Sequence, residues 1–109
     1  MTQPTDAYDS GKIIVYIDPD LQDLIPGFLE NRHKDAASLR RALEGKDFQT
    51  VRLLGHRMKG DGGGYGFDSI SLIGEALEEA AIQENEATIG QTISALTHFL
   101  ANVEISYQK

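Results

Sequence analysis

The sequence predicts an all-α protein: an up-down four-helix bundle with an additional short N-terminal helix and an extended N-terminal arm. Beyond residue 18, apolar residues recur at spacings of three and four, the pattern of helices that bury one face. Helix-capping residues precede these stretches, and the connections are short, so neighbouring helices should run antiparallel. The 109 residues are enough for one modest core, and we expect a single bundle domain over residues 18–109.

The first 17 residues are expected to form a flexible tail and an extended arm. Residues 1–11 are polar and contain a proline and a glycine, which is typical of a loose tail. Residues 13–17, IIVYI, are β-branched or aromatic and should be extended. Because the helical pattern leaves no second strand, an arm lying on the bundle is favoured over a strand that pairs between two copies of the chain.

The first two helical stretches are expected at residues 18–29 and at about 35–44. Pro26 predicts a kink or a short first turn in the first stretch, and Gly45 is a plausible end for the second. Their expected inward residues are Leu21, Leu24, Ile25, Phe28 and Leu29, then Ala36, Leu39 and Leu43.

Three more helices should follow. Asp47 can cap the third, Asp68 can cap the fourth, and the fifth keeps its three-four spacing from Ile89 to Tyr107. The expected inward residues are Phe48, Val51, Gly55, Met58, Gly62 and Tyr65, then Ile70, Ile73, Leu77 and Ala80, and finally Ile89, Ile93, Leu96, Leu100, Val103 and Tyr107.

Composition excludes several classes of function. The net charge is −7 and the pI about 4.8, so nucleic acid and anionic membranes are not expected as partners. The absence of cysteine rules out disulfides and thiolate chemistry. Since the longest apolar run is only residues 13–17 and the N-terminus lacks signal-peptide blocks, we expect a cytoplasmic protein, and a monomer.

Residues 56–66 read HRMKGDGGGYG, a histidine before a lysine and a run of glycines. On a helix whose inward stripe is centred near Val51 and Met58, His56 lies roughly 140° from Val51, on the exposed side. Arg52, Lys59, Gly60 and Gly63 fall beside it. A neutral imidazole is a nucleophile, a lysine attracts a phosphoryl group, and glycines leave room for a bulky donor.

Other interpretations of these residues were weighed. A lone exposed histidine is usually an ordinary surface residue, and Gly55 and Gly62 face inward, where glycine serves packing. The spacing fits neither glycine-rich nucleotide-binding motif. The three histidines, His33, His56 and His98, lie on different helices or helix ends and lack metal-ligand spacing, so no metal site is expected. No Ser/His/Asp or Cys/His arrangement suggests hydrolysis.

The segment HRMKG at residues 56–60, followed by Gly66, resembles the H-x-[apolar]-K-G signature of histidine-containing phosphotransfer (HPt) domains. Leu77-Glu78 in the fourth helix also fits. The run through Gly63, Tyr65, Gly66 and Phe67 is especially similar to the phosphotransfer domain of chemotaxis-type histidine kinases. The resemblance extends from about Asp20 to the C-terminus.

The resemblance implies that His56 accepts a phosphoryl group, usually on Nε2, and exchanges it with an aspartate of a receiver domain. Lys59 would neighbour the phosphate, and Gly60, with Gly63, would give the receiver access. Glu78 matches the acidic residue that orients the histidine through its other ring nitrogen. Asp61 departs from the family pattern, in which a small neutral residue is common at this position.

The expected function is therefore that of a phosphorelay intermediate, a phosphoryl carrier rather than an enzyme with its own ATP-dependent kinase activity. The partners would be a response-regulator receiver domain, a hybrid histidine kinase, or both, with Mg²⁺ on the receiver and no cofactor here. Leu24, Ile25 and Phe28 are candidates for docking, although core packing is favoured for them. The alternatives are an adaptor that docks receivers without being phosphorylated, and a module that dimerises through residues 13–17. A stand-alone relay protein, favoured by Met1, and a part of a larger kinase both fit.

Overall fold

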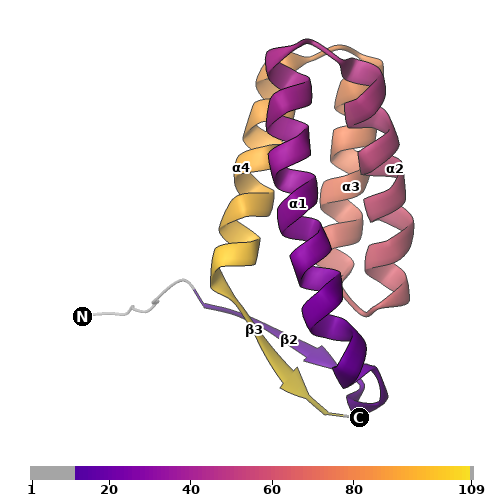
Figure 1. The fold of residues 1–109 in the computed structure, drawn as a ribbon, viewed down its shortest axis with the longest axis vertical. Coiled ribbons are helices and arrows are strands. Elements are labelled where there is room, and N and C mark those ends of the chain that lie inside the picture. Colours follow the sequence, from indigo (N-terminus) through magenta and orange to yellow (C-terminus); the bar gives the residue numbers. More distant parts are fainter. Residues whose placement is uncertain (1–11, 109) are drawn as a thin grey trace, which may run out of the picture.

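The computed structural model describes residues 12–108 and confirms the bundle. Four long helices lie side by side, and a two-stranded sheet and a short 3-10 helix lie together at one end (Figure 1). In chain order the elements are β2 (Ile13–Ile17), η1 (Pro19–Leu24), α1 (Ile25–Glu44), α2 (Phe48–Gly64), α3 (Asp68–Ile82), α4 (Glu86–Asn102) and β3 (Val103–Tyr107). The predicted tail at residues 1–11 lies outside the described residues.

The N-terminal half of the bundle differs from the sequence-based prediction. The predicted short N-terminal helix is present as η1, but it ends at Leu24, and residues 25–44 form one uninterrupted helix, α1, of 20 residues. Pro26 stands in the first turn of α1, where the backbone N–H that proline lacks has no partner within the helix. The proline therefore marks the start of a helix rather than a kink within one.

Of the two predicted caps, Asp47 and Asp68, one is confirmed. Asp47 caps α2, where its carboxylate accepts the backbone N–H of Thr50 at 3.1 Å and the Thr50 hydroxyl at 2.6 Å. These hydrogen bonds lower the pKa of Asp47 below its ordinary value. Asp68, by contrast, lies inside the first turn of α3, and Phe67 occupies the cap position without a side-chain hydrogen bond. The charge of Asp68 still favours that helix end through the helix dipole.

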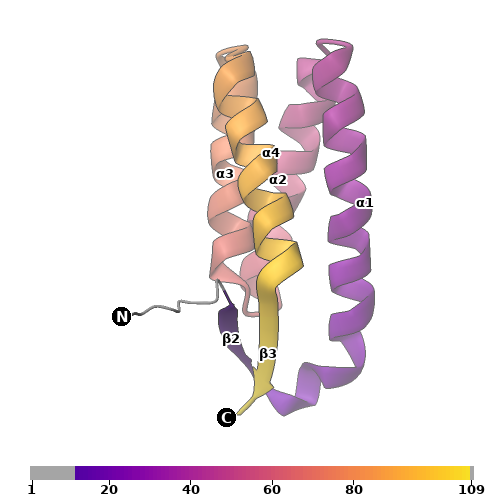
Figure 2. The same cartoon turned by 90° about the vertical axis from the view of Figure 1, so that its left-hand side faces the viewer.

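The prediction that the last helix continues to Tyr107 is wrong. α4 ends at Asn102, and Val103–Tyr107 forms a parallel strand beside Ile13–Ile17, with Val15 opposite Ile105 (Figure 2). The N-terminal strand therefore has an intramolecular partner. The residues VEISY alternate apolar and polar, the period of a strand with one buried face, but Val103 and Tyr107 also continue the helical spacing of α4.

The core includes the aromatic residue that follows α2. Phe67 is fully buried, stacks on Phe28 with ring centroids 5.0 Å apart, and meets Phe99 edge-on at 6.3 Å. Ile17 of β2 is also fully buried, so the strand closes the end of the core. These contacts fix the position of the C-terminal end of α2 along the axis of the bundle.

Candidate functional site

His56 lies near the middle of α2, on the side of the helix turned away from the core. Val51 and Met58 on the opposite side are fully buried, whereas the His56 side chain is 68% exposed. The exposed position follows from the apolar spacing of α2. A partner protein can therefore reach the imidazole without any movement of the bundle.

One carboxylate of α3 contacts the histidine. Oε2 of Glu78 lies 3.0 Å from Nδ1 of His56, and the Glu78 side chain is only 19% exposed. A carboxylate at this distance accepts the Nδ1–H of the ring, and this hydrogen bond leaves the lone pair on Nε2. The other oxygen of Glu78, Oε1, lies 3.9 Å from Nζ of Lys59. The three side chains thus form a cluster in which one carboxylate is shared by an imidazole and an ammonium group.

A close approach of two helices brings these residues together. A Cβ built on Gly55 would lie 2.7 Å from the backbone N of Glu78, and one built on Gly74 would lie 2.4 Å from the backbone N of Lys59. Only glycine permits backbones this close. The hydroxyl of Ser71 adds a hydrogen bond of 2.8 Å to the Lys59 carbonyl. α3 therefore packs close enough to α2 for the carboxylate of Glu78 to contact His56.

The glycines after Lys59 differ in their surroundings. A Cβ on Gly60 would meet nothing within 4 Å, and one on Gly63 would make only an ordinary contact with Ser71 at 3.5 Å. A Cβ on Gly62 would lie 2.6 Å from the backbone N of Ser71, so this position serves packing, as predicted. Gly60 and Gly63 leave open space beside His56, but the bundle itself does not require glycine at Gly60.

Gly66 has a conformational reason to be glycine. Its φ is +89°, a value that other residues rarely adopt, and a Cβ there would lie 3.0 Å from Cδ1 of Ile17. The turn after α2 is thus shaped around the buried end of β2.

A comparison with protein families agrees with this geometry. The model of the Hpt domain matches residues 23–105. The chain belongs to the Hpt domain family. Hpt domains carry phosphoryl groups in phosphorelays and interact with response regulators or kinases. No curated protein and no solved structure matched the chain significantly. The closer similarity to chemotaxis-type domains stays a prediction.

In this Hpt domain the unusual Asp61 faces α1 rather than His56. Its Oδ2 lies 3.7 Å from Nη1 of Arg32, a buried arginine that also lies 2.9 Å, through Nε, from Oδ2 of Asp35 and packs on the Phe28 ring. Burial raises the pKa of Asp35 above its ordinary value, although Arg32 lowers it. The negative charge of Asp61 is therefore offset by Arg32 and turned away from the histidine.

The structure separates the predicted docking residues. Ile25 and Phe28 are buried in the core of the Hpt domain, so the favoured packing interpretation is confirmed for them. Leu24, at the end of η1, is exposed, so its predicted inward position and the packing interpretation are wrong for this residue. Leu53, which the sequence reasoning missed, is also exposed and stands one turn before His56 on α2. The signal that could have found it is its spacing of three from His56, which places both residues on the same side of α2.

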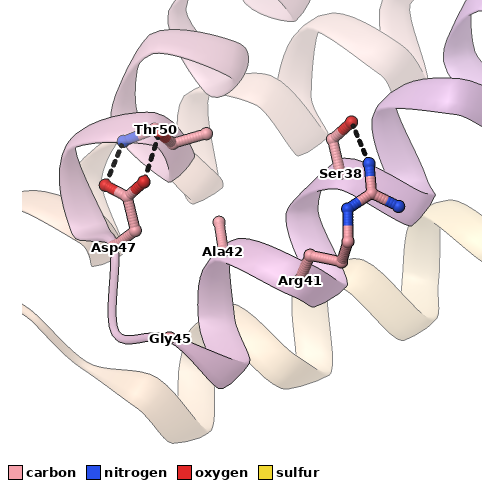
Figure 3. Close-up of a pocket in the computed structure, with 6 residues that line it drawn as sticks. All are labelled: Ser38, Arg41, Ala42, Gly45, Asp47 and Thr50. Atoms are coloured by element: carbon pink, nitrogen blue, oxygen red, sulfur yellow. Dashed lines mark hydrogen bonds between the residues drawn. The ribbon is translucent and has the colours of Figure 1, made fainter.

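Two further features of residues 12–108 were compared with this site: clusters of metal-ligating side chains and a pocket. Within residues 12–108, no three His, Asp or Glu side chains are placed to hold a metal ion. An open pocket at the turn between α1 and α2 is lined by Ser38, Arg41, Ala42, Gly45, Asp47 and Thr50 (Figure 3). Within this pocket, Asp47 already accepts a hydrogen bond from the Thr50 hydroxyl, and Arg41 already donates one to the Ser38 hydroxyl. No helix in the described part of the chain has the length and apolarity to cross a bilayer.

Proposed function

We propose that this Hpt domain accepts a phosphoryl group on Nε2 of His56 and exchanges it with an aspartate of a response-regulator receiver domain. The Nε2 lone pair attacks the phosphorus of an aspartyl phosphate, the bond from phosphorus to the aspartate oxygen breaks, and the aspartate leaves as a carboxylate. The reverse step returns the phosphoryl group to an aspartate. The donor is a receiver, free or within a hybrid histidine kinase.

The contact between Nδ1 of His56 and Glu78 carries this proposal. Phosphorylation at Nε2 places positive charge on the ring, and a carboxylate 3.0 Å from Nδ1 stabilises that charge while keeping the Nδ1 proton in place. The ring is also held in one orientation, so Nε2 presents its lone pair outward. An in-line transfer requires this alignment of acceptor and donor.

Lys59 and the open backbone support the approach of the phosphoryl donor. The Lys59 ammonium lies on the same carboxylate as the histidine and can swing toward an arriving phosphoryl group to offset its charge. Gly60 places no side chain in the approach path, and the exposed Leu53 offers an apolar contact to a docking receiver. The receiver would supply Mg²⁺ and most of the chemistry, so the chain acts as a carrier rather than a kinase.

A transfer assay tests the function. A receiver labelled with radioactive phosphate at its aspartate is mixed with the protein and Mg²⁺, in parallel with the variant His56→Gln. We expect acid-labile, base-stable label on the wild type alone, because phosphohistidine has this stability. His33→Gln and His98→Gln are matched controls and should accept label at the wild-type rate.

The opposite result would favour an adaptor. If a receiver binds the protein but no receiver transfers label to it, the chain docks receivers without being phosphorylated. Label that persists in His56→Gln would place the acceptor elsewhere.

A further inference from the structure

In the described part of the chain, residues 12–108, no strand pairs with the edge of β2 that faces away from β3. Gln108 donates its backbone N–H to the Ile17 carbonyl at 3.0 Å, so Ile17 directs its peptide groups at β3. Peptide groups along an extended strand alternate between its two edges, and Ile14 and Tyr16 therefore direct theirs away from β3. Within residues 12–108 the sheet contains β2 and β3 alone, and no backbone hydrogen bond from outside the strand pair reaches Ile14 or Tyr16.

The side chains on this edge strand are apolar and face solvent. Ile17 is buried and Val15 half-buried against the bundle, whereas Ile14 is 53% and Tyr16 is 63% exposed on the outer face. Proteins usually protect an exposed edge with charges, proline or a covering segment. On the same outer face, β3 carries the charged Glu104 and the polar Ser106 instead of apolar residues.

We propose that two copies of the chain pair through β2, antiparallel about a two-fold axis at Val15, to form a four-stranded sheet β3–β2–β2–β3. In this register Ile14 lies opposite Tyr16 of the second copy, and the outward peptide groups of both residues find hydrogen-bond partners. Aliphatic–aromatic cross-strand pairs stabilise antiparallel strands.

Charge complementarity selects the second copy as the occupant and fixes the register. With Val15 on the axis, Lys12 would lie opposite Asp18 of the second copy at both ends of the paired segment. Oδ1 of Asp18 already accepts the backbone N–H of Asp20 at 2.9 Å, so the ammonium would pair with its other oxygen. Lys12 already lies 3.1 Å from Glu104 on the same face, so in the dimer its ammonium would stand between two carboxylates. A shift by two residues would remove the Lys12–Asp18 pairs and shorten the overlap.

The proposed dimer leaves the phosphotransfer site free. The sheet lies at the end of the bundle where α1 begins and α4 ends, whereas His56 lies in the middle of α2 (Figure 1). Each dimer would therefore present two separate copies of His56. Because the paired strands have only five residues each, the contact is smaller than a stable interface requires, and the dimer should be reversible.

Sedimentation equilibrium over a series of protein concentrations tests this proposal. The measurement uses unphosphorylated protein without a receiver, so its outcome is independent of the proposed phosphotransfer. The weight-average mass should rise from 12.0 kDa toward twice that value. Tyr16→Glu, which alters the outer face, and Ile14→Pro, which removes an outward N–H, should each weaken association at least tenfold. Circular dichroism should show unchanged helix content in both.

Leu72→Glu is the matched control, because Leu72 on α3 is apolar and 66% exposed but lies outside the sheet. It should associate like the wild type. A wild type that stays at 12.0 kDa at every concentration would overturn the proposal. So would Tyr16→Glu and Ile14→Pro variants that associate normally, or a Leu72→Glu variant that is weakened as much as they are.

Discussion

At the scale of single residues, the site depends on how one imidazole is oriented. An exposed histidine without a partner samples both tautomers and several rotamers, and only some of them present Nε2 to a donor. Glu78 holds Nδ1 at 3.0 Å and is itself mostly buried, so it cannot readily swing into solvent. In the proposed transfer, the histidine would therefore be oriented before a receiver binds, which would lower the entropy cost of reaching the in-line geometry.

Removal of the Glu78 carboxylate should slow phosphotransfer. Because a carboxylate that orients an imidazole is typically worth about 10–100-fold in histidine–metal sites, we expect Glu78→Ala to lower the rate of transfer from a phosphorylated receiver by about tenfold. Glu78→Gln, which can still accept a hydrogen bond from Nδ1 but lacks the charge, should fall between Ala and wild type. Initial rates of label transfer measure the effect, with Glu79→Ala on the exposed face of α3 as the control. A wild-type rate in Glu78→Ala would show that the contact has no role in transfer.

The sequence alone was enough to place those residues of the site that belong to a single helix. Helical periodicity places His56, Lys59 and Gly60 on one exposed surface, since all three belong to one helix. The distance to Glu78 depends on how closely α3 packs on α2, which periodicity does not give. The pairing of Asp61 with Arg32 likewise depends on packing between helices.

At the scale of elements, the α2–α3 pair determines the geometry of the site. Gly55 and Gly74 oppose one another, and a Cβ on either would overlap backbone atoms of the facing helix. Backbone atoms cannot move aside as side chains can, so a larger residue must separate the helices. Separation would also draw Glu78 away from His56.

Two glycine substitutions should therefore have opposite effects on stability. Gly74→Ala should lower the free energy of unfolding by about 1–3 kcal/mol through overpacking. Gly60→Ala should raise it by about 0.5–1 kcal/mol, because alanine favours the helix and its Cβ meets nothing within 4 Å. Urea denaturation followed by circular dichroism measures both. Equal destabilisation by the two variants would contradict the assignment of Gly74 to packing and Gly60 to access.

The cap of α2 predicts a dependence of stability on pH. Hydrogen bonds from Thr50 lower the pKa of Asp47 in the folded protein below the ordinary value of 3.8. The stabilisation is thus fully present above pH 3.8 and is lost as the pH falls through the lower, folded-state pKa. Asp47→Ala should destabilise the protein at neutral pH, and the difference from wild type should shrink in strong acid. Denaturation midpoints of both proteins at several pH values test this, and a difference that grows toward acid would contradict it.

At the scale of the whole molecule, the parallel strand pair ties the N-terminal strand to the C-terminal end of the bundle. Ile17 is fully buried, and the turn at Gly66 is shaped around it. The strand is therefore part of the folded domain rather than an arm resting on it. Sequence patterns described the helices well but missed this pairing, because the spacing of Val103 and Tyr107 fits both a helix and a strand.

Substitutions in β2 distinguish an integral strand from an arm. At a protein concentration low enough to keep the chain monomeric, Ile17→Ala should lower the free energy of unfolding by about 2–5 kcal/mol, since a buried isoleucine is lost. Ile14→Ala on the exposed face should change it by no more than about 0.5 kcal/mol. Thermal or urea denaturation provides the comparison. Similar small effects of both variants would mean that the strand contributes little to the fold.

The most direct test of the central claim is to identify which ring nitrogen carries the phosphoryl group. The protein, labelled with ¹⁵N in its histidine rings, is phosphorylated by a phosphorylated receiver, and ³¹P–¹⁵N couplings are recorded by NMR. Because Glu78 holds Nδ1 of His56, the phosphorus should couple to Nε2 of that residue alone. Coupling to Nδ1, or to a nitrogen of His33 or His98, would contradict the assignment of His56 and Glu78 to acceptor and orienting residue.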